Sequence, residues 1–309
     1  MIRESEKPLP GSLLFTTLLV AAVFLFALNG AAAQAQYPEP NVTNPDRVAP
    51  YPPVRIVGNL YYVGTRDLAS YLIATDEGHI LINSGYAGSV PIIRNNIEAL
   101  GFSFEDIKII STAHAHNDHV GGLAEIKRLT GAETQMHVAD IPVLESGGDD
   151  DYRYPGGRGV LFEPIEVDRP LHDGDTIELG GSTLTVHLHA GHTKGAISFS
   201  LTIDEDGTSY DVLIANMGTV NDNVNLTYMP GYPEIVDDYE RTFAAQMAMN
   251  PDIWVASHAG QFDMHDKYHP GMEYSPNNFL DPDGWHEKVA EYEAAFRERI
   301  ASDANKPRN

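Results

Sequence analysis

Short apolar runs alternate with polar turns through the first half of the chain. Runs that end at turn residues predict sheet strands, and they lie at Val54–Ile56, Leu60–Val63, Tyr71–Ala74, His79–Asn83, Ile107–Thr112 and Glu133–Val138. Apolar residues three and four positions apart predict helices, at Val90–Leu100, Leu123–Leu129 and Ala139–Leu144. The first half is therefore predicted to be rich in strand and to end in helix.

The second half repeats this arrangement. Its predicted strands lie at Thr176–Leu179, Leu184–His189, Ile197–Ile203, Asp211–Ala215 and Ile253–Ala256, and its predicted helices at Pro233–Asn250 and Trp285–Ile300. No linker separates the halves, so we expect one α/β domain over 54–303, in which two sheets pack together with helices outside. Residues 36–53, rich in Pro and Asn, predict an extended arm, and 304–309 form a short tail. The segment 147–159 lacks apolar periodicity and predicts a surface loop, a plausible flap over a site.

The N-terminus has the order of a secretory signal. Arg3 and Lys7 precede an apolar stretch, Leu13–Leu28, and small residues follow at 31–35. This order predicts a signal peptide over 1–35 and therefore an exported protein, periplasmic if the source is a Gram-negative bacterium and otherwise secreted. The alternative is an uncleaved membrane anchor, for which the apolar stretch is short. After signal cleavage we expect no stable membrane association.

Composition narrows the classes of partner and of metal ligand. The 309 residues carry a formal net charge of −24, and a surface this acidic repels nucleic-acid phosphates. We therefore expect no nucleic-acid partner, and we expect a monomer. The chain has no cysteine, which excludes disulfides, thiolate ligands and a cysteine nucleophile. Any zinc must be bound by His, Asp or Glu.

The strongest chemical signal is the segment HAHNDH at 114–119, directly after a predicted apolar strand. In an extended backbone His114 and His116 point to the same side and can converge on one ion. Asp118 and His119 follow where the chain turns, so they can be aimed at a second point. Imidazole and carboxylate are ordinary zinc ligands. Four ligands so close together suit two adjacent ions better than one tetrahedral ion.

Two further histidines follow predicted strands and precede glycines. His192 lies in AGHTKG (190–195), and His258 lies in ASHAG (256–260). A tight turn at the end of a rigid strand can present each imidazole to a metal ion. Together with the 114–119 segment, these two residues complete two sets of three ligands.

With these residues the sequence resembles the metallo-β-lactamase superfamily, whose signature is the H-x-H-x-D-H loop, and within it the subclass B3 enzymes. The resemblance runs from about residue 54 to 300, and its other matching segments are GNLYYVGTRDLASYLI (58–73), HDGDTIELGGSTLTVHLHAGHTKG (172–195), YPEIVDDYERTF (232–243) and DIWVASHAGQFDMHDK (252–267). It implies a four-layer αββα sandwich with two zinc ions at one edge, between the sheets. It also implies a division of ligands, with His114, His116 and His192 on the first zinc and Asp118, His119 and His258 on the second.

Three positions depart from the family pattern. Thioesterase-like and lactonase-like members carry a metal-bridging Asp after a later strand, whereas the corresponding stretch here, LIANMGT (213–219), has none, which favours the β-lactamase branch. Within the B3 pattern Met217 replaces a usual Ser, and a thioether cannot donate a hydrogen bond. Asn83 stands where the superfamily often has Asp, and we expect it to hydrogen-bond a ligand or a loop backbone.

The resemblance and the ligand set predict zinc-dependent hydrolysis of the β-lactam amide bond of β-lactam antibiotics by a metal-bound hydroxide, since zinc lowers the pKa of bound water to roughly 7. Asp118 is expected to bind metal and to orient the nucleophile or accept its proton. Candidates for binding the substrate carboxylate are Thr219, Asn221 and Asn223, on the loop after the strand that ends near Met217. The alternatives are a hydrolase of another acyl substrate, such as a lactone or thioester, on the same fold, and an exported zinc-binding protein without catalysis.

Overall fold

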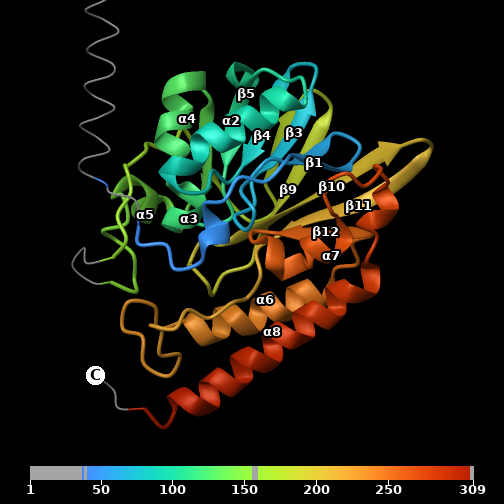
Figure 1. The fold of residues 1–309 in the computed structure, drawn as a ribbon. Coiled ribbons are helices and arrows are strands. Elements are labelled where there is room, and N and C mark those ends of the chain that lie inside the picture. Colours follow the sequence, from blue (N-terminus) through green and yellow to red (C-terminus); the bar gives the residue numbers. More distant parts are fainter. Residues whose placement is uncertain (1–36, 38–39, 155–158, 307–309) are drawn as a thin grey trace, which may run out of the picture. The chain divides into compact units, whose positions relative to one another are not determined.

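Two sheets form the centre of the structure (Figure 1). The computed structural model describes Tyr37 and residues 40–154 and 159–306, so the predicted signal peptide lies outside the described residues. The first sheet contains, in spatial order, β1 (Val54–Val57), β2 (Leu60–Tyr62), β3 (Tyr71–Thr75), β4 (Gly78–Ile82), β5 (Ile107–Ser111), β6 (Glu133–His137) and β7 (Arg169–Leu171). The second contains β12 (Ile253–Ala256), β11 (Thr208–Ala215), β10 (Ile197–Glu205), β9 (Ser182–Leu188) and β8 (Thr176–Leu179).

Side-chain alternation along the strands gives the first sheet two buried faces. Ile73 of β3 and Ile80 of β4 belong to the core that lies between the sheets. Their neighbours Leu72 and Leu81 point the opposite way, into a second core beneath helices. Because both faces are covered, the central strands are continuous apolar runs rather than alternating ones.

Helices cover the outer face of each sheet (Figure 1). The second core joins the first sheet to α2 (Val90–Ala99) and α4 (Leu123–Thr130). On the other side, α6 (Ile235–Ala248) and α8 (Pro282–Asp303) pack on the second sheet. The other α-helices among the described residues are short: α3 (Asn117–Val120), α5 (Ile141–Glu145) and α7 (Met264–Lys267). The order helix, sheet, sheet, helix confirms the predicted αββα sandwich.

The observed elements differ from the predicted ones mainly in their limits, which turn residues and helix caps determine. β10 and β11 are longer because Asp206 and Gly207 both have positive φ, which permits a tight two-residue hairpin turn. α8 begins before its apolar pattern because the Asp281 side chain accepts a hydrogen bond from Gly284 N. The edge strand β7 was not predicted, since Pro170 lies within it and proline is tolerated only at sheet edges.

The predicted extended arm is not extended throughout. It contains a 3-10 helix at Pro45–Arg47, where the Asn44 side chain accepts a hydrogen bond from Asp46 N at 3.1 Å. This turn directs Arg47 toward the segment that follows β5. None of the helices in the described part of the chain has both the length and the apolar character that a bilayer span requires.

The two sheets are joined at the edge where the predicted ligand segments begin. Ile197 N, at the start of β10, donates to Ala113 O of the first sheet's 112–116 loop at 2.8 Å. Ala69 N donates to Ser257 O, just after β12, at 3.1 Å. Since β11 and β12 are parallel, their carboxyl ends lie at the same edge. The segments after β5, β9, β11 and β12 therefore meet there.

Candidate metal centre

The 114–119 segment bridges the end of β5 and the start of α4. His114 and His116 lie in the irregular stretch after the strand, and Asp118 and His119 lie in the short helix α3. His114, His116 and His119 are buried, whereas the Asp118 side chain is 18% exposed. The change from strand to helix gives the side chains different directions, although His114 still lies close to His119, with ring centroids 4.3 Å apart.

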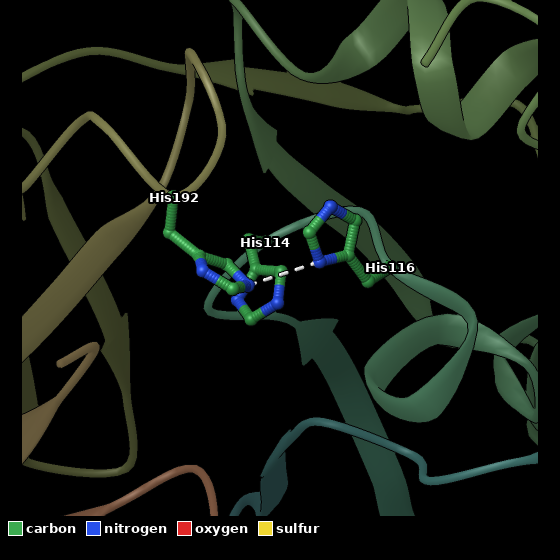
Figure 2. Close-up of side chains that lie close together, drawn as sticks. All are labelled: His114, His116 and His192. Carbon is green, nitrogen blue, oxygen red and sulfur yellow. Dashed lines mark hydrogen bonds between the residues drawn. The ribbon is translucent and has the colours of Figure 1, made fainter. Parts of the chain in front are cut away.

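The first group of side chains consists of His114, His116 and His192, and Figure 2 shows their rings converging. One ligand atom from each lies within 4.8 Å of the others. His192 Nε2 and His116 Nδ1 are 3.1 Å apart, and the ring centroids of His114 and His192 are 4.6 Å apart. His192 follows β9 and reaches the segment after β5 from the other sheet. The geometry thus assembles three nitrogen donors from two sheets.

The second group shares one histidine with the first. Ligand atoms of His114, Asp118 and His119 also lie within 4.8 Å of one another. His258, which follows β12, is adjacent: its Nε2 lies 3.6 Å from Asp118 Oδ2, and its ring centroid lies 5.1 Å from that of His119. The structure therefore brings together all six residues that the sequence singled out as metal ligands, with His114 between the two groups.

Unpaired nitrogens show that these residues fit a metal ion. Both ring nitrogens of His114, Nε2 of His116 and Nδ1 of His119 are buried and have no hydrogen-bond partner among the described residues. Buried polar atoms are normally paired, so His114 and His119 each have a ring nitrogen arranged for a partner that accepts its lone pair, whereas His116 Nε2 faces the Asp151 carboxylate at 3.8 Å. Burial lowers the pKa of all three well below the ordinary value, and that of His192 to about 4. Neutral imidazoles with one carboxylate are a donor set typical of zinc.

The Asp118 carboxyl is ionised. Burial alone would raise its pKa, but the neighbouring His258, His114 and Arg47 together lower it below the ordinary value. Arg47 Nη1 lies 3.4 Å from Asp118 Oδ2. The carboxylate oxygens also face the histidines, since Oδ1 is 3.7 Å from His119 Nε2. An ionised carboxylate among neutral imidazoles can bind a cation or accept a proton.

A second aspartate, Asp140, joins the two ligand segments. Its buried carboxylate accepts hydrogen bonds from Ala115 N at 3.0 Å, Thr193 Oγ1 at 2.6 Å and Gly195 N at 2.7 Å. A side chain at Gly195 would place Cβ 2.6 Å from Asp140 N, so only glycine fits. Sequence reasoning missed Asp140, because it lies at the start of the predicted helix 139–144 and nothing in its local pattern marks it.

Hydrogen bonds to the far ring nitrogens orient His192 and His258. His192 Nδ1 donates to Thr219 O at 2.8 Å, which leaves Nε2 to face the first group. His258 Nδ1 lies 3.3 Å from Asp67 Oδ2, which leaves Nε2 to face Asp118. Such outer contacts commonly fix the tautomer of a metal-binding histidine. The role of Asp67 was not predicted, since it is 191 residues from His258 in the chain.

Asn83 contacts the loop backbone before His114. Its Oδ1 accepts hydrogen bonds from Ala113 N at 2.9 Å and Thr112 Oγ1 at 3.0 Å. Asn83 has a φ of 63°, a region that asparagine tolerates better than most residues. Asn83 therefore supports the ligand segment from behind and does not enter the cavity.

A cavity of about 440 Å³ opens over both groups. Its wall includes Arg47, Tyr86, Met217, Thr219, Asn221 and Gln261, together with residues of the predicted flap: Gly148, Asp151, Arg153 and Tyr154. Of the three residues expected to bind substrate, Thr219 and Asn221 line the cavity. Asn223 does not, and its side chain is exposed, because the chain turns between Asn221 and Val224 and carries it away from the cavity.

His189 is buried just before the His192 turn but belongs to neither group. Its Nδ1 lies 2.6 Å from Ser198 Oγ, and burial lowers its pKa to about 3. Between about pH 6.5, the ordinary value, and pH 3, the unfolded chain binds a proton that the folded chain excludes. The free energy of unfolding must therefore fall as the pH is lowered through this range.

His189→Gln should remove this pH dependence. Between pH 7 and pH 5 the chelator-treated variant should lose about 2 kcal/mol less unfolding free energy than the parent chain. Urea unfolding at the two pH values measures the difference. The exposed His269 provides a control, since His269→Gln should leave the parent's pH dependence unchanged. Equal losses in the parent and in His189→Gln would contradict the assignment.

Comparison with solved structures yields relatives that match nearly end to end. The class B3 di-zinc metallo-beta-lactamase LRA-12 from an Alaskan soil metagenome is 46% identical with a TM-score of 0.82, covering 85% of this chain and 99% of that chain. Metallo-beta-lactamase GOB-18 from Elizabethkingia meningoseptica is 44% identical with a TM-score of 0.82, covering 85% and 97%. A beta-lactamase from Chitinophaga pinensis is 43% identical with a TM-score of 0.81, covering 84% and 98%.

Sequence relatives match over shorter stretches. A hydroxyacylglutathione hydrolase from Hyphomonas neptunium is 34% identical over 109 residues, which span 35% of this chain and 35% of that enzyme. A beta-lactamase-like protein 2 homolog from Caenorhabditis elegans is 26% identical over 170 residues, 54% of this chain and 51% of that protein. The chain thus spans about a third to a half of the length of these proteins.

A family model covers most of the domain and includes five of the six candidate ligands in its interior. The model described as the metallo-beta-lactamase superfamily matches residues 64–258, so its last matched residue is the sixth, His258. The solved relatives share the fold at 43–46% identity. The chain belongs to the metallo-beta-lactamase superfamily.

Proposed function

We propose that this protein hydrolyses the amide bond of β-lactam antibiotics and that it uses two zinc ions bound at the cavity. The observation that carries the proposal is the convergence of six metal-binding side chains at one cavity, on a chain that covers 97–99% of solved lactamases at 43–46% identity. LRA-12, one of these relatives, is a di-zinc enzyme. No cysteine or serine nucleophile is needed for this chemistry.

The proposed ligands follow the two groups. His114, His116 and His192 would hold the first ion. Asp118 and His119 would hold the second together with His258, whose Nε2 faces Asp118. Bound zinc supplies an activated water at neutral pH and stabilises negative charge that develops on oxygen or nitrogen. The protein's own part is to keep the imidazoles neutral and fixed. Burial keeps His192 neutral by lowering its pKa to about 4, and the contacts of His192 with Thr219 O and of His258 with Asp67 hold the two rings in place.

Asp118 has a further role beyond binding metal. Its carboxylate is ionised and partly exposed to the cavity. It can therefore orient the attacking water and accept its proton, which general-base groups do when they lie within hydrogen-bond reach. Arg47 lies against the same carboxylate and is 36% exposed, so it keeps Asp118 ionised and presents positive charge to an anionic substrate.

The substrate carboxylate would be bound on the loop after β11. Asn221 Nδ2 is buried and has no hydrogen-bond partner among the described residues, so it can donate to a ligand. Both Thr219 O and Thr219 Oγ1 contact His192 Nδ1, at 2.8 Å and 3.1 Å, and the hydroxyl hydrogen of Thr219 can still be donated to a ligand. Met217 is buried at the same wall and adds apolar contact in place of a donor.

The test is hydrolysis by zinc-loaded protein that starts at residue 36. We expect loss of lactam absorbance with at least one penicillin, cephalosporin or carbapenem, full inhibition by a chelator, and recovery when zinc is added back. Zinc bound at two equivalents without turnover of any of these compounds would refute the proposal.

The alternative substrate class is tested on the same preparation. Similarity to hydroxyacylglutathione hydrolase over 109 residues points to thioesters. A panel of thioesters and homoserine lactones should give lower kcat/KM than the β-lactams. The reverse order would identify the protein as a thioesterase or lactonase, and no hydrolysis of any compound would favour a zinc-binding protein without catalysis.

We further propose that the protein acts outside the cytoplasm as a monomer without nucleic-acid partners. The signal-like order of residues 1–35 supports export. The net charge of −24 supports the proposal that no nucleic acid is a partner. Fractionation of the producing cells tests the first point, and sedimentation of the purified protein tests the oligomeric state.

A further inference from the structure

Residues 151–153, of which Asp151 and Arg153 line the cavity, contact two histidines of the first metal group. Tyr152 Oη donates to His192 O at 3.1 Å. Asp151 Oδ2 lies 3.8 Å from His116 Nε2, and the two side chains are only 9% and 7% exposed. These residues belong to the segment that the sequence marked as a flap, and neither contact was expected from the sequence.

The His116 ring has two distinct sides. Its Nδ1 faces His192 Nε2 at 3.1 Å, and this is the side turned toward the metal group (Figure 2). Its Nε2 is buried, has no hydrogen-bond partner among the described residues, and is the atom near Asp151. If Nδ1 binds metal, Nε2 must carry the ring's proton. The His116 ring therefore places a buried N–H next to an anionic oxygen of Asp151.

Arg153 fixes the Asp151 carboxylate. Its Nε lies 3.1 Å from Oδ1 and 3.0 Å from Oδ2, and its Nη2 lies 2.6 Å from Oδ2. Arg153 N also donates to Oδ1 at 2.9 Å. Four contacts hold the carboxylate in one orientation, and such charge-assisted bonds with arginine are both strong and directional. The carboxylate therefore reaches His116 as a fixed group.

We propose that Asp151 is a positioning residue for His116: its carboxylate holds the imidazole so that Nδ1 faces the first metal ion, and it strengthens zinc binding there. The inference rests on the proposed role of His116 as a metal ligand. Carboxylates that contact the outer nitrogen of a ligand histidine fix its tautomer and raise its basicity, and their removal typically costs 10- to 100-fold in metal affinity.

Zinc affinity of a single site tests the proposal without reference to turnover. The His258→Ala background removes a ligand of the second group, so that the first group dominates binding. In this background Asp151→Asn should weaken zinc binding about 10- to 100-fold, measured by competition with a chromophoric chelator. Asp151→Glu should recover part of the loss. The exposed Asp149 is the matched control, and Asp149→Asn should bind zinc as tightly as the background protein.

The outcomes separate this inference from the proposed function. Equal affinity in Asp151→Asn and its background would overturn the inference while leaving the metal centre intact. Failure of the unmutated chain to bind zinc would overturn the proposed function itself. If Asp151→Asn does not fold, nitrogen-15 spectra of the unmutated zinc-loaded protein decide: we expect a protonated Nε2 on His116, and metal bound at Nε2 instead would overturn the inference.

Discussion

Asp118→Asn should lower kcat/KM for β-lactams by about 10²- to 10⁴-fold, the range expected when a group that handles a proton is lost. The amide keeps the shape of the side chain but cannot accept a proton, and it is a weaker ligand for a cation. It also removes one of two anionic neighbours of Arg47 and His258, which lie 3.4 Å and 3.6 Å from Asp118 Oδ2 and keep Asp67 as the other. Steady-state kinetics with a chromogenic cephalosporin measure the effect.

Metal content separates the two roles of Asp118. If the variant binds two zinc ions at saturating metal and is still slow, the loss lies in proton handling. If it binds one, the loss lies in ligation. The control is Asp106→Asn, an exposed aspartate whose ion pair with Lys108 at 3.3 Å lies at the surface, where such pairs contribute little. Turnover near that of the parent with full metal content would show that Asp118 has neither role.

Asp140→Ala should have the largest effect on stability. It removes the acceptor of two buried backbone donors, Ala115 N and Gly195 N, and each buried donor left unpaired costs roughly 1–3 kcal/mol. We expect the free energy of unfolding to fall by about 2 to 6 kcal/mol. Urea unfolding of the chelator-treated protein measures this, because bound metal would otherwise add its own stabilisation.

Asp140→Asn distinguishes the loss of charge from the loss of an acceptor. Three donors converge on the two carboxylate oxygens, so in either orientation the amide NH₂ meets at least one donor. The variant should therefore also be destabilised, though without the cavity that alanine leaves. The control is Asp76→Ala in an exposed turn, where the change should be small. A stability equal to that of the parent would show that Asp140 does not tie the two segments together.

Local patterns predicted much of the architecture and all six candidate ligands. Strand and helix periodicities such as those of Tyr71–Ala74 and Val90–Leu100 depend on neighbours within a few residues, which the sequence displays directly. The 114–119 segment could be interpreted for the same reason, since its residues converge through backbone geometry alone. The sequence also predicted α8 and the strands of the β10–β11 hairpin, but it placed their ends wrongly, because capping and turn residues set those ends.

The contacts that hold the ligands in place were decided only by the tertiary structure. His116 meets His192 across 76 residues and Asp67 meets His258 across 191, and no local pattern links such positions. Asp140 and Asp151 are for the same reason ordinary acids in the sequence, and only packing of the two sheets gives them partners at the site. By itself the sequence determined which groups can bind metal, because that follows from residue type and spacing. The folded chain alone decided how each group is oriented and that Asn223 lies outside the cavity, because orientation depends on contacts between distant segments.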